Sequence, residues 1–418
     1  MVRFMHSADW QIGMTRRWLQ PEAQARFTAA RIEAIRRMGR IAQTEGCEFL
    51  VVAGDVFESN QLQPQTVLRA LEALAEVPVP VYLLPGNHDP LDGVTVYRQR
   101  TFARSCPEHV HVLDTSGPTA VRDGLELVAA PWHGKHPDRD LVAEAMSHVG
   151  PADGTVRVVV GHGIVDVLDP RRDRPAAIAT ARLEEALARG RIHYVALGDR
   201  HSRTSVGGSG AIWYSGASEV TDHREGLPGD VLVVDVAQGV PPVVTPHHVG
   251  TWRFTAMHRD LTGAADVRRL DDDLGAVPDK DRTVVTLALR GTLPVEDYAE
   301  LTELLERHAT VFAALRDWDR HADLVVMSGD ADLDDAGLGG FVAAAARDIR
   351  SLASVESAVT APPPAPATGA RVAPALPDVD EDVDEDLRWT YDAGRGDDTE
   401  SARDALALLF RLTREDAR

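Results

Sequence analysis

The sequence predicts a layered α/β fold for about its first 240 residues. Short β-rich runs alternate there with longer segments whose apolar residues recur at helical spacing. Several of the short runs end in a glycine followed by Asp, Asn or His. In an open α/β sheet, ligands bind beyond the carboxyl ends of the strands, so these polar ends also predict where the functional site lies.

Eight short runs are expected to form strands. In chain order they are RFMHSAD (3–9), EFLVVAGD (48–55), VPVYLLPGN (79–87), LELVAAPW (125–132), VRVVVGH (156–162), IHYVALGD (192–199), AIWYSG (211–216) and DVLVVDV (230–236).

Two helices are expected to pack on these strands. The first extends from Pro21 to Thr44 and is ended by Gly46, and the second extends from about Pro64 to Glu76. Both carry one apolar face. The residues on these two faces are Phe27, Ile32, Ile35, Met38 and Ile41, and Val67, Leu68, Leu71 and Leu74.

A second, smaller α/β module is expected from about Thr251. TVVTLALRG (283–291) predicts a strand, the segment from Pro294 to about His308 predicts a helix, and LVVM (324–327) predicts another strand. Beyond this module, the Pro- and Ala-rich segment 361–377 and the acidic run 378–386 predict a flexible linker over 352–390. An apolar helix follows the linker, with Ser401 and Asp404 as a capping-box-like start.

Length and composition limit the class of protein. A chain of 418 residues is long enough for two or three domains. No apolar run approaches the roughly 18 residues of a membrane span. Cys47 and Cys106 are too few for a disulfide framework or a Cys-rich zinc site. The start of the chain shows no signal-peptide pattern, so we expect a cytoplasmic protein.

The net charge of −21 is unevenly distributed. Residues 1–250 hold 25 Lys and Arg against 30 Asp and Glu, while residues 251–418 hold the remaining 19 against 35. The acidity therefore belongs mostly to the second part of the chain, and a nucleic-acid partner for the first part is not excluded.

Polar clusters at the strand ends predict a metal centre. Taken singly, Asp9 is also typical of a turn, Asp55 of a helix N-cap and His162 of a core histidine. Taken together, the clusters supply carboxylate, amide and imidazole donors without thiolates, a set that suits Mn, Fe or Mg and, less specifically, Zn. Two such ions about 4 Å apart can stabilise both the attacking and the leaving oxygen of a phosphoester.

The order of these clusters resembles the calcineurin-like metallophosphoesterases, and within them the SbcD-type DNA-repair exonucleases. The family pattern is D-x-H, GD, GNH[DE], a lone H and GHxH. It is present here as DWQ (9–11), GDVFE (54–58), GNHD (86–89), GHG (161–163) and GDRH (198–201). MHSADWQIG at the N-terminus and WYSGASEVTDHREG (213–226) indicate the SbcD-like subgroup.

The resemblance covers about residues 1–240, and the remainder resembles the family only in domain order. It implies a layered β-sandwich flanked by helices in a nuclease domain at 1–250. It also implies a capping domain that orients DNA at 251–351. After the linker, 391–418 would then hold a partner-docking helix.

The resemblance implies two metal ions, expected to be Mn²⁺, with Mg²⁺ or Fe²⁺ as alternatives. One ion would be held by Asp9, Gln11, Asp55 and His201, and the other by Asp55, Asn87, His162 and Asp199. Two positions depart from the family pattern: Gln11 and Asp199 stand where histidines are usual. If these two are not ligands, His6 and His223 are the first alternatives.

The resemblance also implies the catalytic residues. His88 would bind no metal but would protonate the leaving oxygen, and Asp89 would orient the His88 imidazole.

The predicted function is that of a Mn-dependent DNA exonuclease that hydrolyses phosphodiester bonds at DNA ends. The expected partners are DNA, an SbcC-type coiled-coil ATPase bound by the C-terminal helix, and a second copy of the chain, but no membrane. One alternative is a phosphodiesterase acting on nucleotides or small phosphoesters, because the metal motifs are shared and the net charge disfavours DNA. Another is a catalytically weak scaffold of the same fold, because two ligand positions depart from the pattern.

Overall fold

The computed structural model describes residues 1–171, 174–318, 322–327 and 348. These residues belong to two compact units, of which the first is Met1–Phe254 and the second begins at Thr255. The linker expected at 352–390 and the helix expected at 391–418 lie outside the described residues.

The first unit contains two six-stranded sheets. The strands of one sheet, in spatial order, are β12 (Val240–His248), β11 (Asp230–Ala237), β1 (Val2–Ser7), β2 (Leu50–Val52), β3 (Val81–Leu83) and β4 (Val110–Val112). Those of the other are β5 (Gly117–Arg122), β6 (Leu125–Ala129), β7 (Val156–His162), β8 (Tyr194–Gly198), β10 (Ile212–Tyr214) and β9 (Thr204–Val206).

The central strands of each sheet run parallel. In the first sheet β1, β2, β3 and β4 are parallel neighbours. In the second, β6, β7, β8 and β10 are parallel neighbours. Parallel neighbours end at the same edge of a sheet, so the loops that follow them gather at one end of the unit.

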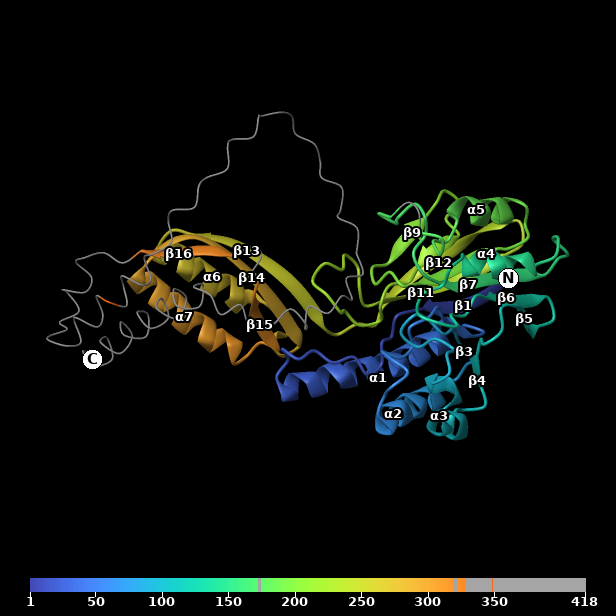
Figure 1. The fold of residues 1–418 in the computed structure, drawn as a ribbon, viewed down its shortest axis with the longest axis horizontal. Helices are drawn as coiled ribbons and strands as arrows, with labels where there is room; N and C mark the ends of the chain where they lie inside the picture. Colours follow the sequence, from blue (N-terminus) through green and yellow to red (C-terminus); the bar gives the residue numbers. More distant parts are fainter. Residues whose placement is uncertain (172–173, 319–321, 328–347, 349–418) are drawn as a thin grey trace, which may run out of the picture. The chain divides into compact units, whose positions relative to one another are not determined.

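Helices cover the outer faces of both sheets (Figure 1). α1 (Pro21–Glu45) and α2 (Pro64–Ala75) pack on the first sheet, and α4 (Leu141–Ser147) and α5 (Thr180–Ala188) pack on the second. The remaining helical segments of this unit are η1 (Val96–Arg98) and α3 (Arg100–Ser105).

Side-chain alternation along β1 shows how the layers are built. Met5 points into the core beneath α1 and α2, while its neighbour Phe4 points into the core between the sheets, where it stacks on Phe49 at a ring distance of 4.9 Å. The same inner core holds Val158 and Tyr194 from the second sheet. The expected fold, a layered β-sandwich flanked by helices, is confirmed.

The two predicted helices begin and end where their sequence signals lie. Each has a proline at its first position, where the missing N–H costs no hydrogen bond. Gly46 ends α1 with a φ of 69°, and its N–H donates back to the Ala42 and Gln43 carbonyls.

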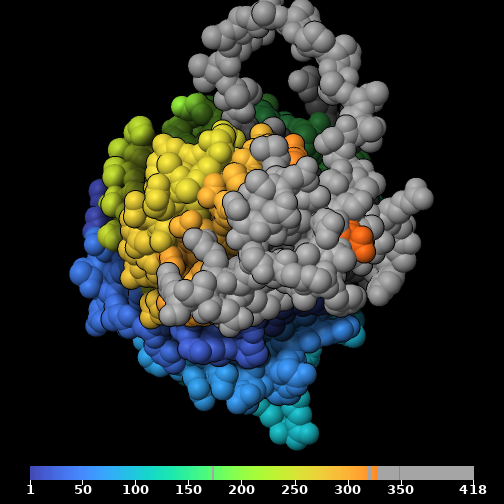
Figure 2. Space-filling view, turned by 90° about the vertical axis from the view of Figure 1, so that its left-hand side faces the viewer, coloured from blue at the N-terminus to red at the C-terminus, as the bar shows by residue number. Residues whose placement is uncertain are grey.

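The second unit is built around a four-stranded sheet. Its strands are β13 (Arg253–Leu261), β14 (Thr283–Pro294), β15 (Ala314–Asp317) and β16 (Asp323–Met327), and its helical segments are α6 (Ala264–Ala276), η2 (Lys280–Arg282) and α7 (Val295–Ala309). Leu270 of α6, Leu304 of α7 and Leu287 of β14 lie in one core. This unit supplies the yellow to orange atoms of Figure 2. Among the described residues of both units, no helix has the length and apolarity needed to cross a membrane.

Candidate metal centre

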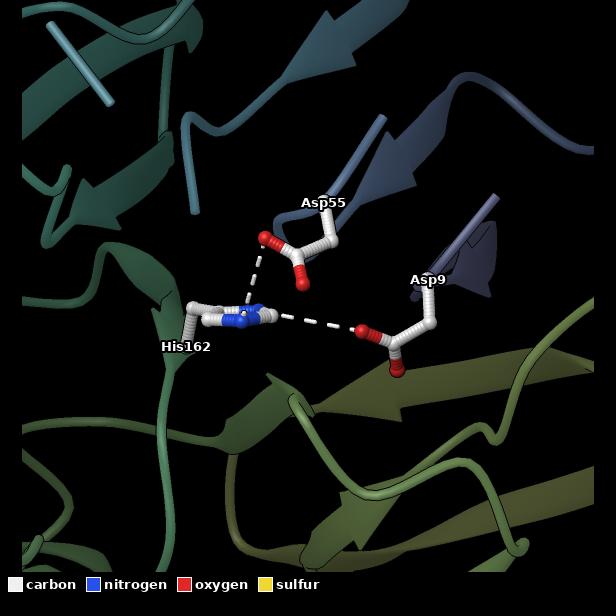
Figure 3. Close-up of side chains that lie close together, drawn as sticks. All are labelled: Asp9, Asp55 and His162. Carbon is white, nitrogen blue, oxygen red and sulfur yellow. Dashed lines mark ion pairs between the residues drawn. The ribbon is translucent and has the colours of Figure 1, made fainter. Parts of the chain in front are cut away.

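Side chains from both sheets meet at the carboxyl ends of the parallel strands. Asp9 follows β1, Asp55 follows β2 and His162 ends β7, and all three are buried (Figure 3). One ligand atom from each lies within 4.8 Å of the other two. Asp199 follows β8, and its Oδ1 lies 3.8 Å from His162 Nε2.

The backbone at these strand ends is unusual. Asp9, Gln11, Asp55 and Asp199 have φ angles of 52°, 44°, 52° and 98°, a left-handed conformation that non-glycine residues rarely adopt. The loops after β1 and β2 are bonded to each other, because Asp9 N donates to Gly54 O at 3.1 Å and Gln11 N donates to Asp55 O at 2.9 Å. These bonds hold the strained residues in place.

Two glycines make room for the site. A Cβ at Gly54, whose φ is 96°, would lie 2.1 Å from His162 Nδ1. A Cβ at Gly86 would lie 2.1 Å from Asp55 Oδ1. No side chain fits in either position, which explains the GD and GN pairs of the sequence.

His162 presents one ring nitrogen to a group of oxygens. Its Nδ1 lies 2.9 Å from the carbonyl oxygen of Ala53, which accepts its proton. Its Nε2 lies 2.7 Å from Asn87 Oδ1, 3.4 Å from Asp55 Oδ1 and 3.8 Å from Asp199 Oδ1. The four residues expected around one metal ion are therefore together, with Nε2 as the atom that faces the others.

Gln11 and His201 lie next to each other. Gln11 Nε2 is 3.2 Å from His201 Nε2, and Gln11 Oε1 is buried without a hydrogen-bond partner. Asp9 accepts from Asp199 N at 3.0 Å, which ties this side of the site to the end of β8. The structure thus brings Gln11 close to His201, as the first of the two expected ligand sets requires.

The electrostatics of the site reflect buried charge. Burial raises the pKa of Asp9 to about 6. Burial also acts to raise the pKa of Asp55, but His162 and His88 outweigh it, so that pKa lies below its ordinary value. Burial acts to lower the pKa of His162, but the charges of Asp55, Asp199 and Asp9 raise it well above its ordinary value. The buried acids therefore favour a cation among them.

The donor set fits divalent cations. Gln11 Oε1 has a free lone pair although it is buried, and His162 Nε2 faces three oxygens. A buried acceptor without a donor is costly unless a cation neutralises it. Carboxylate, amide oxygen and imidazole donors are those that Mn²⁺, Fe²⁺ and Mg²⁺ accept.

His88 is held differently from the expectation. Its Nδ1 lies 3.0 Å from the carbonyl oxygen of Glu58, and its Nε2 is 3.9 Å from Asp55 Oδ2. Asp89, which was expected to orient this imidazole, has other partners. Its carboxylate accepts from Gly86 N at 2.7 Å, Phe57 N at 3.0 Å and the Tyr97 hydroxyl at 2.6 Å. It braces the loop that carries His88.

Sequence reasoning missed the residues behind His201. Its Nδ1 lies 2.9 Å from Thr221 Oγ1 and 3.0 Å from Glu225 Oε1. Both belong to the 213–226 segment, whose resemblance to the SbcD-like subgroup was the one available signal. The carbonyl oxygens of Ala53 and Glu58 gave no signal, because backbone groups are the same in every residue.

The two alternative histidines have other contacts. His6 is buried, with Nδ1 3.1 Å from the Tyr194 hydroxyl and Nε2 3.1 Å from the carbonyl oxygen of Leu197. Both of its ring nitrogens are therefore engaged away from the metal centre. His223 Nδ1 lies 3.6 Å from Asp222 Oδ1.

Comparison with known proteins places this geometry in context. Residues 2–203 match the calcineurin-like phosphoesterase family. The chain is 25% identical over 321 residues to YhaO, an uncharacterised metallophosphoesterase of Bacillus subtilis, covering 70% of this chain and 72% of that protein. It is 28% identical over 366 residues to the SbcD component of the nuclease SbcCD of Rhodobacter capsulatus, covering 73% of this chain and 84% of that protein.

Similar solved structures include TT1561 of Thermus thermophilus and a dimetal phosphatase from Danio rerio. Both are 12% identical to this chain, with TM-scores of 0.36 and 0.35. The first comparison covers 59% of this chain and 99% of the other, and the second covers 58% and 98%.

Proposed function

We propose that this chain is a Mn²⁺-dependent DNA exonuclease. Its residues 2–203 form a calcineurin-like phosphoesterase domain, and the chain is a metal-dependent phosphoesterase. The observation that supports this proposal is the buried group of Asp9, Asp55 and His162, whose ligand atoms lie within 4.8 Å of one another, with His88 Nε2 3.9 Å from Asp55 Oδ2. When bound, two divalent cations stabilise the attacking and the leaving oxygen of a phosphodiester.

In this proposal Asp55 would be a ligand of both ions. Its Oδ1 lies 3.4 Å from His162 Nε2 and accepts from His88 N at 3.0 Å, so the carboxylate stands between the His162 side of the site and the His88 loop. Asp9, Gln11 and His201 complete one ligand set. Asn87, His162 and Asp199 complete the other.

His88 is proposed as the general acid. The Glu58 carbonyl accepts the proton of Nδ1, so Nε2 is the atom that carries the mobile proton. His88 is partly exposed, with 18% of its side-chain surface accessible. A protonated Nε2 at this position donates to the leaving oxygen of the phosphodiester, a step that contributes about 10²–10⁴-fold to rate.

Mn²⁺ is proposed because of the two departures. Gln11 and Asp199 supply oxygen where the family pattern has imidazole nitrogen. Oxygen is the harder donor and suits Mn²⁺ or Mg²⁺ better than Zn²⁺.

DNA is proposed as substrate because of the relative in Rhodobacter capsulatus, which is named as part of a nuclease. The subgroup-like segment 213–226 supports the same reading. The net charge of −21 favours a second candidate, a phosphodiesterase for small substrates, since DNA binding needs cationic contacts.

The test compares substrates under one set of conditions. End-labelled linear duplex, closed circular duplex, bis-p-nitrophenyl phosphate and cyclic nucleotides are each incubated with the protein and Mn²⁺, with Asp55→Ala as the blank. The proposal expects loss of label from the linear duplex, while the closed circle, followed by gel electrophoresis, stays intact. Turnover confined to the small esters would favour the second candidate, and no turnover of any would favour a scaffold.

The proposed assembly is a cytoplasmic homodimer that works with a coiled-coil ATPase. The apolar segment after 391 is the proposed contact with that ATPase, from its sequence pattern alone.

A further inference from the structure

The loop between β10 and β11 places a buried carboxylate directly behind His201. Glu225 Oε1 lies 3.0 Å from His201 Nδ1, and only 4% of the Glu225 side chain is accessible. Thr221 Oγ1 lies 2.9 Å from the same nitrogen. All three residues belong to the first unit of the chain.

These contacts fix which nitrogen of His201 carries the proton. The Thr221 hydroxyl donates its single proton to Glu225 Oε1, so its oxygen can only accept from His201. The Glu225 carboxylate also only accepts. Two acceptors face Nδ1, so Nδ1 must donate, and in the neutral ring the lone pair is then on Nε2.

The contacts on the other side of the ring agree with this tautomer. Gln11 Nε2, a donor, lies 3.2 Å from His201 Nε2, and the Gln11 carbonyl oxygen is the buried atom left without a partner. In this arrangement Nε2 is the acceptor atom of the His201 ring, and the Gln11 carbonyl oxygen is a second buried acceptor.

The loop itself is anchored. Thr221 N donates to Glu225 Oε2 at 3.0 Å, and Arg16 Nη2 donates to the Thr221 carbonyl at 3.1 Å. Glu225 thus accepts hydrogen bonds at both oxygens, and its position does not depend on His201 alone.

We propose that Glu225 is a positioning residue for the metal ion shared by Asp9, Gln11, Asp55 and His201, acting through the Nδ1 proton of His201. The inference rests on the ligand role of His201 in the proposed function. A carboxylate on Nδ1 fixes the ring orientation and makes Nε2 a stronger donor, and removal of such a partner typically costs 10–100-fold in metal affinity. The ion near His162 should be unaffected, because the Ala53 carbonyl holds that imidazole.

The experiment titrates the metal-free full chain with Mn²⁺ by calorimetry. Glu225→Gln removes the negative charge with little change in size. Glu184→Gln is the matched control, because Glu184 also braces a loop, accepting from Gly208 N at 2.8 Å and Ser209 N at 3.2 Å, away from the metal centre. We expect Glu225→Gln to lower the affinity for one of the two Mn²⁺ ions by about 10–100-fold. We expect the control to leave both affinities unchanged.

A second measurement uses only the wild-type protein, so it does not depend on whether a variant folds. ¹⁵N spectra of histidine-labelled, metal-free wild type report the tautomer of His201, and the proposal expects protonation at Nδ1. A ring protonated only at Nε2, or unchanged Mn²⁺ affinities in a folded Glu225→Gln protein, would overturn the inference. A wild type that binds two ions but cleaves no DNA would instead overturn the proposed function and leave this inference standing.

Discussion

Backbone strain at single residues is concentrated in the candidate metal centre. Among the described residues, five other than glycine have left-handed φ, and four of these are Asp9, Gln11, Asp55 and Asp199. Each such conformation costs about 1–3 kcal/mol and persists only where its surroundings enforce it. The bonds from Asp9 N and Gln11 N to the loop after β2 provide that enforcement. Two of the strained residues, Asp9 and Asp55, place carboxylate oxygens within 4.8 Å of each other and of a nitrogen of His162.

Removal of Asp55 and removal of His88 should have different effects. Asp55→Ala is expected to abolish both activity and binding of a metal pair, because each ligand set loses its shared carboxylate. His88→Ala is expected to retain two ions and to lose about 10²–10⁴-fold in turnover. Metal content by mass spectrometry is measured beside the rates, and a His88→Ala protein emptied of metal would show that His88 is a ligand.

The two departures should set metal preference. Replacing Gln11 and Asp199 together by histidine restores imidazole nitrogen at each ion and removes one of three carboxylates. We expect the double variant to bind Zn²⁺ more tightly relative to Mn²⁺ than the wild type does. Calorimetric titration of both proteins with both metals measures the ratio, and an unchanged ratio would mean that neither residue is a ligand.

For single residues, the sequence predicted which residues lie at the site, but it did not predict all of their hydrogen-bond partners. The residues that meet at Asp55 were all predicted from their order along the chain. The contacts of Asp89 were not predicted. Its carboxylate accepts hydrogen bonds from Phe57 N and the Tyr97 hydroxyl, and the sequence does not show that these residues lie near Asp89 in the folded loop. Glu225 was missed because it lies 24 residues beyond His201 in a loop without regular spacing.

At the scale of elements, buried strands and long helices follow directly from their sequence, while exposed strands do not. β7 is apolar and buried along its length, and α1 carries a long apolar face. β12 was not expected, because Pro241, Pro242 and Pro246 interrupt it and most of its side chains are exposed. It pairs with β11 at one edge of its sheet. On the outer side of an edge strand no neighbouring strand needs a hydrogen bond from the backbone N–H that proline lacks.

The turn after β3 should not tolerate a side chain at Gly86. The Cβ of Gly86→Ala would lie 2.1 Å from Asp55 Oδ1 and 2.5 Å from Asp55 N, so backbone must move. We expect a loss of about 1–3 kcal/mol in the free energy of unfolding, together with weaker binding of both ions. Gly93→Ala in the same loop region is the control, because nothing lies within 4 Å of its Cβ. Denaturant unfolding measures both, and equal stabilities would contradict the packing argument.

At the scale of the whole molecule, the two units differ in what they contribute. The described metal-centre residues all belong to Met1–Phe254, while most of the negative charge lies after residue 250. Three segments of the second unit were predicted as strand, helix and strand, and all three are confirmed as β14, α7 and β16. α6 was not expected, because its few apolar residues lie among a run of aspartates.

Buried His6 should make stability depend on pH. Burial lowers its folded-state pKa to about 3, against 6.5 for an exposed histidine. Below pH 6.5, His6 therefore binds a proton in the unfolded chain but not in the folded chain. The free energy of unfolding falls as the pH falls toward 3. Relative to His6→Gln, the metal-free wild type should lose about 1.4 kcal/mol per pH unit between roughly pH 5.5 and 4.

Urea unfolding across this pH range is the measurement. His136→Gln is the matched control, because His136 is exposed in the folded protein. Parallel pH profiles for wild type and His6→Gln would show that folding does not lower the pKa of His6.

The C-terminal segment should matter for assembly and not for hydrolysis. A chain ending after about Asp386 is expected to keep Mn²⁺-dependent activity and to lose association with the ATPase, because the apolar segment beyond it is removed. Pull-down with the cognate ATPase compares the two forms. Equal retention of both would rule out this segment as the contact.

The hydrogen bonds between the loops after β1 and β2 also determine how far apart Asp9 and Asp55 lie. They continue the pairing of two neighbouring parallel strands as far as Asp9 and Asp55. Neighbouring strands in any sheet are about 4.8 Å apart, a constant of backbone geometry, and this distance carries over to the backbone of Asp9 and Asp55. The spacing of these two carboxylates is thus inherited from the peptide chain itself. The side chains at positions 11 and 199 can therefore differ from the family pattern without changing this spacing.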